Sequence, residues 1–212
     1  MWAARFVDQC LMALGGTVEK IYISEDALIQ DSFRLGVEIF NSGYRPDFLV
    51  GIWRGGSTVG IYVQECLQYL GVETDHISIR TSYQGQPGYQ EMIDSDTGIK
   101  VHGLQYLLEN LNRDNKLLIV DDVFSSGLSI KAVIDQLQAR NKRNMPEDVR
   151  VAVPWYKPSN NRTDRQPDFY INTSNQWLVL PYEMVGLSEQ EIIDNKPGLG
   201  AIMASINRPQ QT

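Results

Sequence analysis

Residues 116–130, KLLIVDDVFSSGLSI, decide how the chain folds. The apolar run at residues 117–120 is continuous and rich in branched side chains, which is typical of a strand buried on both faces of a parallel sheet. Two adjacent carboxylates, Asp121 and Asp122, follow at the carboxyl end of this strand. Open α/β sheets bind their ligands at that end, so the stretch predicts an α/β fold with a polar site at this point.

A loop of serine and glycine follows the two carboxylates and opens a helix. Residues 124–129, FSSGLS, combine a flexible backbone, three hydroxyls and the N–H groups of a helix start, all of which suit a phosphate. Many Ser/Gly loops before a helix are only turns with a serine cap. The paired carboxylates favour a ligand site over such a turn, because they can bind sugar hydroxyls or Mg²⁺ while the amides bind the anion.

The composition limits the class of protein. A chain of 212 residues with 42% hydrophobic residues is sufficient for one α/β domain. Its net charge of −7 argues against a nucleic-acid partner, which would require a basic face. No apolar run approaches the roughly 18 to 20 residues of a membrane helix, so we expect no membrane partner. The two cysteines, Cys10 and Cys66, show neither metal-binding nor disulfide spacing, which predicts a cytoplasmic location.

Strand and helix patterns alternate along the chain, which predicts a mostly parallel central sheet flanked by helices. Residues 81–100 are rich in Gly, Gln, Ser and Asp and lack periodicity, so we expect a long loop that acts as a lid. The predicted elements are helices over 24–43, 57–71, 104–111 and 130–141, strands over 48–53, 76–80, 116–123 and 149–155, and two short strands within 167–183.

A second glycine-containing turn follows the strand at residues 48–53. In Arg54-Gly55-Gly56 the glycines allow a ligand to approach the backbone, the helix start supplies amides, and the arginine supplies a cation for a diphosphate. A plain tight turn is the alternative for this tripeptide taken alone. A single Arg-Gly-Gly between a strand and a helix argues against an RNA-binding repeat.

These two elements, in this order, resemble the type I phosphoribosyltransferases, and in particular the hypoxanthine and xanthine-guanine enzymes. The resemblance implies the type I phosphoribosyltransferase fold, with a small C-terminal hood and a flexible lid loop. We divide the chain into an N-terminal extension (1–17), a phosphoribosyltransferase domain (18–187) and a C-terminal tail (188–212). Within the domain, residues 81–100 are the lid loop and residues 157–183 are the hood that recognises the base.

The resemblance also implies which residues bind each part of the substrate phosphoribosyl pyrophosphate (PRPP). Asp121 and Asp122 hold the ribose hydroxyls, directly or through Mg²⁺, and the peptide bond between Trp53 and Arg54 is expected to be cis. The implied PRPP-binding set is Arg54, Gly55, Gly56, Asp121, Asp122, Phe124, Ser125, Ser126, Gly127, Leu128 and Ser129. The implied catalytic set is Asp121, Asp122, Arg54 and Ser125, the metal ligands are Asp121, Asp122 and Glu183, and the lid residues are Ser82 and Tyr83.

The order of residues 157–183 resembles the base-recognising end of the same enzymes. By that resemblance Lys157 donates to the 6-oxo group, Trp177 lies on the purine ring and the backbone of Leu178 reads the base edge. Glu183 stands where the family places an acidic residue near a second Mg²⁺. Taken singly, each residue has a plainer interpretation: a solvated lysine, a core tryptophan and a surface carboxylate.

Ser125 departs from the family pattern. The 6-oxopurine branch usually has an aspartate there, close to N7 of the base, and a neutral serine cannot act as a general base at pH 7. We expect a pentosyltransferase of purine salvage that transfers the phosphoribosyl group of PRPP to hypoxanthine, guanine or xanthine, as a dimer or tetramer. The alternatives are a phosphoribosyltransferase for an unusual heterocyclic base and a PRPP- or nucleotide-binding regulator with little catalysis.

Overall fold

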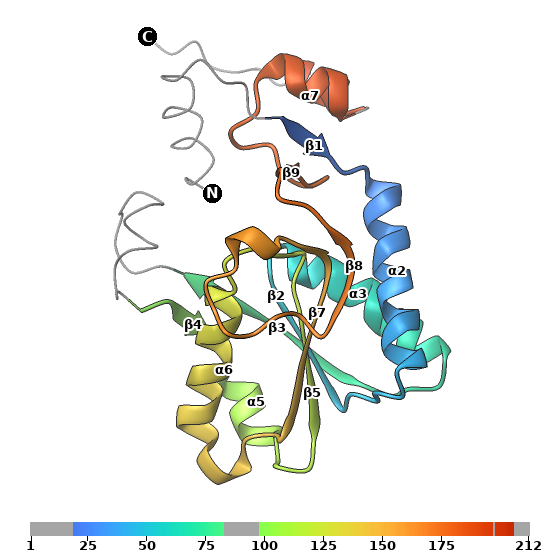
Figure 1. The fold of residues 1–212 in the computed structure, drawn as a ribbon. Coiled ribbons are helices and arrows are strands. Elements are labelled where there is room, and N and C mark those ends of the chain that lie inside the picture. Colours follow the sequence, from blue (N-terminus) through green and yellow to red (C-terminus); the bar gives the residue numbers. More distant parts are fainter. Residues whose placement is uncertain (1–18, 83–97, 197, 206–212) are drawn as a thin grey trace. The chain divides into compact units, whose positions relative to one another are not determined.

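The computed structural model describes residues 19–82, 98–196 and 198–205 (Figure 1). It divides into a larger unit, residues 26–175, and a smaller unit drawn from residues 1–25 and 176–212. Tyr83 and most of the predicted lid loop lie outside the described residues. None of the helices in the described ranges combines the length and the apolar character that are needed to cross a membrane.

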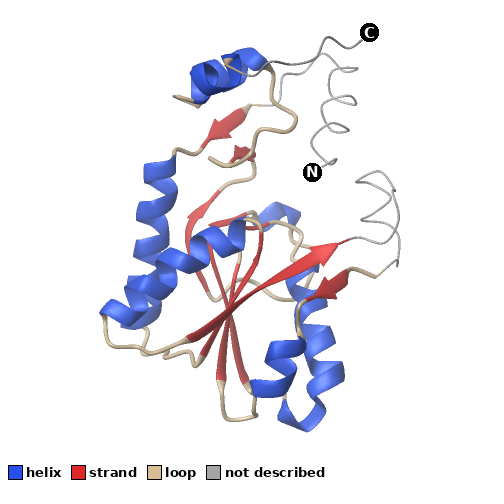
Figure 2. Cartoon of the chain, turned by 180° about the vertical axis from the view of Figure 1, so that it is seen from behind, coloured by secondary structure: helices blue, strands red, loops and turns tan. Residues whose placement is uncertain are grey.

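A mostly parallel sheet of seven strands forms the centre of the larger unit (Figure 2). Its path runs β4-β3-β2-β5-β7-β6, β8 pairs with β7, and β3 with β4 is the antiparallel pair. The strands are β2 (Phe48–Trp53), β3 (Asp75–Ser82), β4 (Lys100–His102), β5 (Lys116–Val120), β6 (Val123–Phe124), β7 (Asp148–Tyr156) and β8 (Phe169–Thr173). The predicted parallel α/β fold is therefore confirmed.

Helices cover both faces of this sheet. They are α2 (Glu25–Asn41), α3 (Gly55–Tyr69), α5 (Gln105–Asn110) and α6 (Leu128–Asn141). Two short 3₁₀ helices are also present: η1 (Lys142–Asn144) follows α6, and η2 (Pro158–Asn160) follows β7. Leu107 of α5 and Val133 of α6 belong to one buried core with Ile119 of the central strand. On the other face α3 approaches β2 so closely that a Cβ at Gly60 would lie 3.2 Å from Leu49 Cδ2.

The parallel register brings the carboxyl ends of three strands to one edge. Ile119 of β5 pairs with Val50 of β2 on one side and with Val151 of β7 on the other. Strand β5 ends at Val120, opposite Gly51 and Ala152, while β7 continues beside β6 to Tyr156. The residues that follow β2, β5 and β7 therefore lie at the same carboxyl edge of the sheet. These are the segments in which the sequence places its polar residues.

Among the differences between predicted and observed element boundaries, two concern the strand of residues 116–123 and the loop of residues 81–100. The strand predicted over 116–123 is interrupted at Asp121 and Asp122, because these residues leave the ladder before β6 resumes at Val123. The loop predicted over 81–100 is shorter at both ends, because Ser82 of β3 pairs with Lys100 of β4. Short strands at a sheet edge alternate polar and apolar residues, and they lack the continuous apolar run that marked the central strands.

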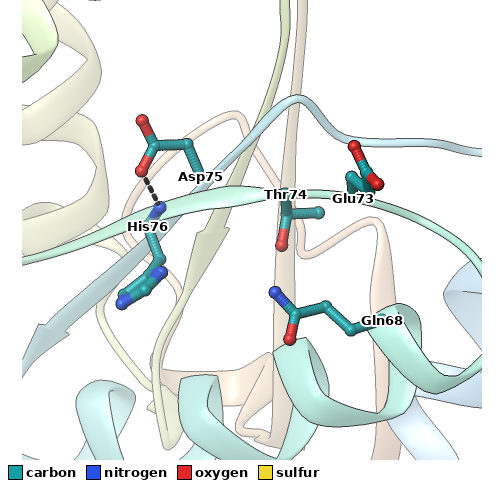
Figure 3. A pocket seen from close by; sticks show the side chains of 5 residues that line it. All are labelled: Gln68, Glu73, Thr74, Asp75 and His76. Atoms are coloured by element: carbon teal, nitrogen blue, oxygen red, sulfur yellow. Dashed lines mark hydrogen bonds between the residues drawn. The ribbon is translucent and has the colours of Figure 1, made fainter.

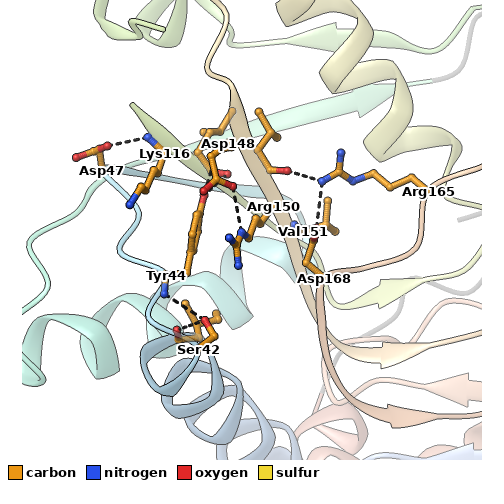
Figure 4. A network of polar contacts seen from close by, with 12 residues as sticks. Ser42, Tyr44, Asp47, Lys116, Asp148, Arg150, Val151, Arg165 and Asp168 are labelled. Carbon is orange, nitrogen blue, oxygen red and sulfur yellow. Dashed lines mark hydrogen bonds and ion pairs between the residues drawn. The ribbon is translucent and has the colours of Figure 1, made fainter. Parts of the chain in front are cut away.

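A polar network closes the opposite, amino end of β5 and β7 (Figure 4). The buried Tyr44 hydroxyl lies 2.9 Å from the carbonyl oxygen of Leu117 and 3.2 Å from that of Asp148. The Arg150 guanidinium lies 4.3 Å from the centre of the Tyr44 ring and also pairs with the Asp148 carboxylate at 3.0 Å. Burial, followed by the charge of Asp148, raises the pKa of Tyr44. This network ties the start of β2 to the central strands.

The smaller unit joins the two ends of the described chain. Strand β1 (Lys20–Tyr22), which was not predicted, pairs in parallel with β9 (Trp177–Val179). Helices α7 (Glu189–Asn195) and α8 (Leu199–Ala204) follow. Both Lys20 Nζ and the Tyr22 hydroxyl donate to Glu191 Oε1 at 2.8 Å.

Candidate active site

The Arg54-Gly55-Gly56 turn packs directly on the end of β5. A Cβ at Gly56 would lie 2.4 Å from the carbonyl oxygen of Val120 and 2.8 Å from Cα of Asp121. Such distances leave no room for a side chain, so the two backbones touch because residue 56 is glycine. The peptide bond between Trp53 and Arg54 is cis, which confirms that expectation, and Arg54 is exposed at the start of α3.

Backbone amides hold the two carboxylates in place. The Asp122 amide donates to Asp121 Oδ1 at 3.0 Å, and the Val123 amide donates to Asp122 Oδ1 at 2.8 Å. Burial, followed by the neighbouring charge of Asp122, raises the pKa of Asp121 well above its ordinary value, although the amides of Asp122 and Gly56 oppose this. The pair is thus an oriented acidic group at the carboxyl end of a central strand.

Residues 125–129, which we call the serine loop, lead into α6 through Gly127, whose backbone is left-handed. Gly127 has φ of 75° and precedes the helix, and the Leu128 amide donates to Ser126 Oγ at 3.4 Å. A Cβ at Gly127 would lie 2.7 Å from Thr163 Oγ1 and 2.8 Å from the Phe124 ring. Glycine is therefore required at position 127, because the backbone there has a positive φ and leaves no room for a side chain.

Residues 157–165, which we call the cap segment, pack on this loop from the end of β7. The Lys157 amide donates to the Phe124 carbonyl at 2.9 Å, and the Arg162 amide donates to the Ser126 carbonyl at 3.0 Å. Between them, Asn160 Nδ2 donates to Ser125 Oγ at 3.2 Å. Sequence reasoning missed Asn160 and Arg162, because a polar stretch gives no signal of which distant loop it will contact.

The larger unit gathers most of the predicted site residues at one edge of its sheet. They follow three strands: Arg54, Gly55 and Gly56 after β2, residues 121–129 after β5, and Lys157 after β7. The phosphate-binding and catalytic roles of these residues stay predictions, since proximity alone assigns no role. Ser82 ends β3, where its Oγ lies 2.9 Å from Nε2 of His102.

Three predicted residues belong to the smaller unit. Trp177 and Leu178 are in β9, and the side chain of Leu178 is buried. The carboxylate of Glu183 accepts a hydrogen bond from the Leu180 amide at 3.0 Å. Lys196, which is also buried, donates through Nζ to the carbonyls of Leu180 and Pro181. The base-binding role of Trp177 and Leu178 and the metal-binding role of Glu183 stay predictions.

Asp121 and Asp122 offer the kind of oxygen ligands that Mg²⁺ prefers. In the described part of the chain no cluster of three or more acidic, histidine or cysteine side chains could hold a metal ion. Mg²⁺ is usually bound by one or two carboxylates together with water and substrate phosphates, rather than by an all-protein cage. Two adjacent carboxylates therefore fit a metal that arrives with a diphosphate.

A pocket of about 730 Å³ lies at the other end of the sheet (Figure 3). Its lining residues are Gln68, Glu73, Thr74, Asp75 and His76. Because β3 begins at Asp75, this pocket faces the amino end of that strand, whereas the predicted residues stand at the carboxyl ends. The pocket contains none of the predicted site residues.

The fold and its strand-end loops define a mostly parallel α/β protein with the polar residues at the ligand-binding edge. The family model of the phosphoribosyl transferase domain matches residues 20–185. The chain belongs to this family, and it is a phosphoribosyltransferase. No curated protein matches the sequence.

Solved structures agree with this fold. A purine phosphoribosyltransferase from Pyrococcus horikoshii Ot3 is 22% identical with a TM-score of 0.57, covering 80% of this chain and 97% of that one. A hypothetical protein from Neisseria gonorrhoeae with bound ppGpp is 19% identical with a TM-score of 0.62, covering 80% and 92%. The xanthine-guanine-hypoxanthine phosphoribosyltransferase of Helicobacter pylori is 17% identical with a TM-score of 0.57, covering 79% and 95%. At these identities the likeness describes the fold.

Proposed function

We propose that this phosphoribosyltransferase transfers the 5-phosphoribosyl group of PRPP to a 6-oxopurine, namely hypoxanthine, guanine or xanthine, and releases diphosphate. The observation that carries the proposal is the packing of the Arg54-Gly55-Gly56 turn against Asp121, because it joins a diphosphate-type turn to a pair of carboxylates. The purine enzymes of Pyrococcus horikoshii and Helicobacter pylori share this fold and support a purine as the acceptor.

In the proposed reaction the bond from C1 of the ribose to the diphosphate oxygen breaks, and a bond from C1 to a ring nitrogen of the base forms. The diphosphate leaves with the bonding electrons, and the proton of the base passes to water. Arg54 and the amides at the start of α3 stabilise the charge that develops on the diphosphate. Mg²⁺, when bound at Asp121 and Asp122, supplies further neutralisation of that leaving group.

The remaining residues orient the sugar and the base. Asp121 and Asp122 bind the ribose hydroxyls, and their negative charge favours the positive charge that grows on the sugar. The serine loop at residues 125–129 binds the 5-phosphate through its hydroxyls and amides. Lys157 donates to the 6-oxo group, which favours oxopurines over aminopurines, and its position after β7, beside the serine loop, supports this role.

Several further assignments rest on the family resemblance and are part of the same proposal. Trp177 stacks on the purine, the Leu178 backbone reads its edge, and Glu183 serves a second Mg²⁺. Ser82 and Tyr83 belong to a lid that excludes water from the reacting sugar. We also propose a cytoplasmic homo-oligomer, a dimer or tetramer, that binds neither nucleic acid nor membranes. The buried free thiol of Cys66 supports the cytoplasmic location, and the net charge of −7 supports the proposal that no nucleic acid is bound.

A regulator that binds PRPP or a nucleotide with little catalysis is the second candidate. It is favoured by Ser125 in place of the expected aspartate, and the Neisseria gonorrhoeae structure shows that a protein of this fold binds ppGpp. A phosphoribosyltransferase for an unusual heterocycle is the third. The test is incubation with PRPP, Mg²⁺ and a panel of free bases, with nucleotide and diphosphate measured separately.

The outcomes separate the candidates. Turnover of hypoxanthine, guanine or xanthine supports the proposal. Turnover of a different heterocycle, with none of these three bases, would favour a phosphoribosyltransferase for an unusual heterocycle. No turnover, with PRPP still raising the thermal unfolding midpoint, would favour the regulator.

A further inference from the structure

We propose that Asn160 is a positioning residue for the phosphate-binding loop, in which it holds the Ser125 hydroxyl as a hydrogen-bond donor toward the bound ligand. The inference rests on the proposed function in that it takes the 5-phosphate of PRPP as the ligand of this loop. Its starting point is the bond from Asn160 Nδ2 to Ser125 Oγ, which spans 35 positions of the sequence at 3.2 Å.

Asn160 is fixed in place by the turn to which it belongs. It ends η2, where its amide donates to the Lys157 carbonyl at 3.1 Å and the Asn161 amide donates to the Pro158 carbonyl at 3.3 Å. The Ser159 amide donates to Asn175 Oδ1 at 3.2 Å, which ties the turn to the end of β8. Asn160 itself is exposed, and because its backbone is anchored in this way, only its side-chain torsions must be ordered for it to bond Ser125.

The cap segment is also anchored beyond Asn160. Asn161 Oδ1 accepts hydrogen bonds from the Thr163 amide and hydroxyl, both at 3.0 Å, and Asn161 Nδ2 donates to the Arg165 carbonyl at 2.9 Å. The Arg162 amide then bonds the Ser126 carbonyl. Asn160 therefore stands between two backbone contacts to the loop, so its bond to Ser125 is part of a three-point attachment.

The chemistry of this bond determines what Ser125 can do. A serine hydroxyl has one O–H to donate and two lone pairs that accept. Because the Asn160 amide donates to Oγ, it occupies an acceptor position and leaves the O–H for another partner. Ser125 is half-buried in the loop, and a phosphate oxygen is an acceptor only, so an anion bound there is the matching partner.

A carboxylate at position 125 could accept the same amide but would have no hydrogen to donate. The Asn160 and Ser125 pair is thus neutral and donates to the ligand, where an aspartate would be anionic and only accept. This difference predicts that removal of Asn160 affects the binding of the phosphate more than the chemical step. A loss of ground-state and transition-state binding in equal measure raises KM and leaves kcat unchanged.

The test compares Asn160→Ala, Ser125→Ala and the double variant, with Ser159→Ala as the matched control on the same turn. The dissociation constant of ribose 5-phosphate is measured by calorimetry, and KM for PRPP and kcat are measured with the best base. We expect each single variant to weaken ribose 5-phosphate binding and to raise KM for PRPP about threefold to tenfold, the usual effect of one hydrogen bond, and we expect Asn160→Ala to keep kcat within about twofold. The double variant should be no weaker than either single variant.

The isosteric Asn160→Asp keeps the side-chain volume and tests the same bond where Asn160→Ala does not fold. It loses the donor and adds a negative charge beside the loop, so binding should fall more than in Asn160→Ala. The positioning role would be overturned, even in a protein that transfers to a base, by either of two results. The first is equal ribose 5-phosphate binding by Asn160→Ala and the Ser159→Ala control. The second is a loss of ribose 5-phosphate binding in the double variant that equals the product of the two single losses.

The same measurements separate the two levels of inference. If the protein transfers to no base but binds ribose 5-phosphate, and Asn160→Ala weakens that binding, the positioning role stands and the proposed function falls. If the protein binds neither PRPP nor ribose 5-phosphate, both fall.

Discussion

Gly56 and Asp121 are in direct backbone contact, since a Cβ on Gly56 would lie 2.8 Å from Cα of Asp121 and 3.0 Å from its Oδ1. The Gly56 amide also bonds the Asp121 carboxylate, where it lowers the pKa that burial raises. The proposed diphosphate turn and the proposed ribose-binding carboxylates thus form one rigid feature. A change at Gly56 or at Asp121 should therefore affect both diphosphate binding and ribose binding.

Replacement of Gly56 by alanine should displace Asp121. The added methyl group has backbone atoms on its nearest side, which cannot move aside cheaply, so we expect the free energy of unfolding to fall by about 1 to 3 kcal/mol. Urea unfolding and PRPP binding would measure both effects. The control is Gly98→Ala, whose Cβ meets nothing within 4 Å. Equal stability and PRPP binding in the two variants would contradict the assigned contact.

Replacement of Asp122 by asparagine should remove a charge from the proposed metal and ribose site with little change of volume. We expect kcat/KM for PRPP to fall by about 100-fold or more, as happens when one preorganised electrostatic contact is lost. Removal of Mg²⁺ with EDTA should abolish transfer by the native protein, and added Mg²⁺ should restore it. Asp135→Asn, which breaks only the exposed ion pair with Lys131, is the matched control. Full transfer in EDTA would exclude the assigned metal role.

Replacement of Ser125 by aspartate should raise kcat on an oxopurine, because it restores a carboxylate that can take the proton of the base. We expect a gain of about tenfold or more at saturating PRPP, which is less than the roughly 100-fold or more that a fully positioned general base contributes. Asn160 can donate to either residue, so the loop should keep its attachment. Ser125→Asn supplies the control of similar size without charge. If neither variant gains activity, the proton leaves by another route.

Stability should depend on Glu191 in acid. Burial raises the pKa of Glu191, but hydrogen bonds from Lys20, the Ser188 amide and Tyr22 outweigh it and lower the pKa to about 2. A carboxyl group whose pKa is lowered on folding stabilises the protein above its ordinary pKa of 4.5, and that contribution is lost as the pH falls from there toward 2.

Glu191→Gln removes this contribution, so the variant should be less stable at pH 6 and nearer to the native protein at pH 2.5. Thermal unfolding across that range provides the measurement. Glu189→Gln, on the same helix, is the control. A difference between native protein and Glu191→Gln that does not shrink in acid would disagree with the lowered pKa.

The central part of the fold was predictable because its signals are local. Continuous apolar runs marked β2, β5 and β7, and glycines or polar residues marked where each run ended. The resemblance then implied the cis peptide before Arg54. The short strands β1 and β4 were missed, since three residues that pair at a sheet edge carry no periodicity of their own.

The contacts that build the candidate site were less predictable, because they join residues far apart in the sequence. Nothing near Gly56 indicates that it will touch Asp121, and nothing near Asn160 indicates that it will bond Ser125. Such contacts follow from the parallel register, which brings separate loops to one edge. The sequence could predict the chemistry of each loop but not the partner that orients it.

Transfer of the phosphoribosyl group from PRPP to a 6-oxopurine can be measured directly. The most direct measurement is the simultaneous release of diphosphate and formation of nucleotide from PRPP and hypoxanthine, guanine or xanthine in the presence of Mg²⁺, with Asp122→Asn as the reference of strongly reduced activity. We expect at least one of the three bases to yield nucleotide and diphosphate in equal amounts with the native protein. Absence of nucleotide with all three bases, while PRPP still binds, would contradict it.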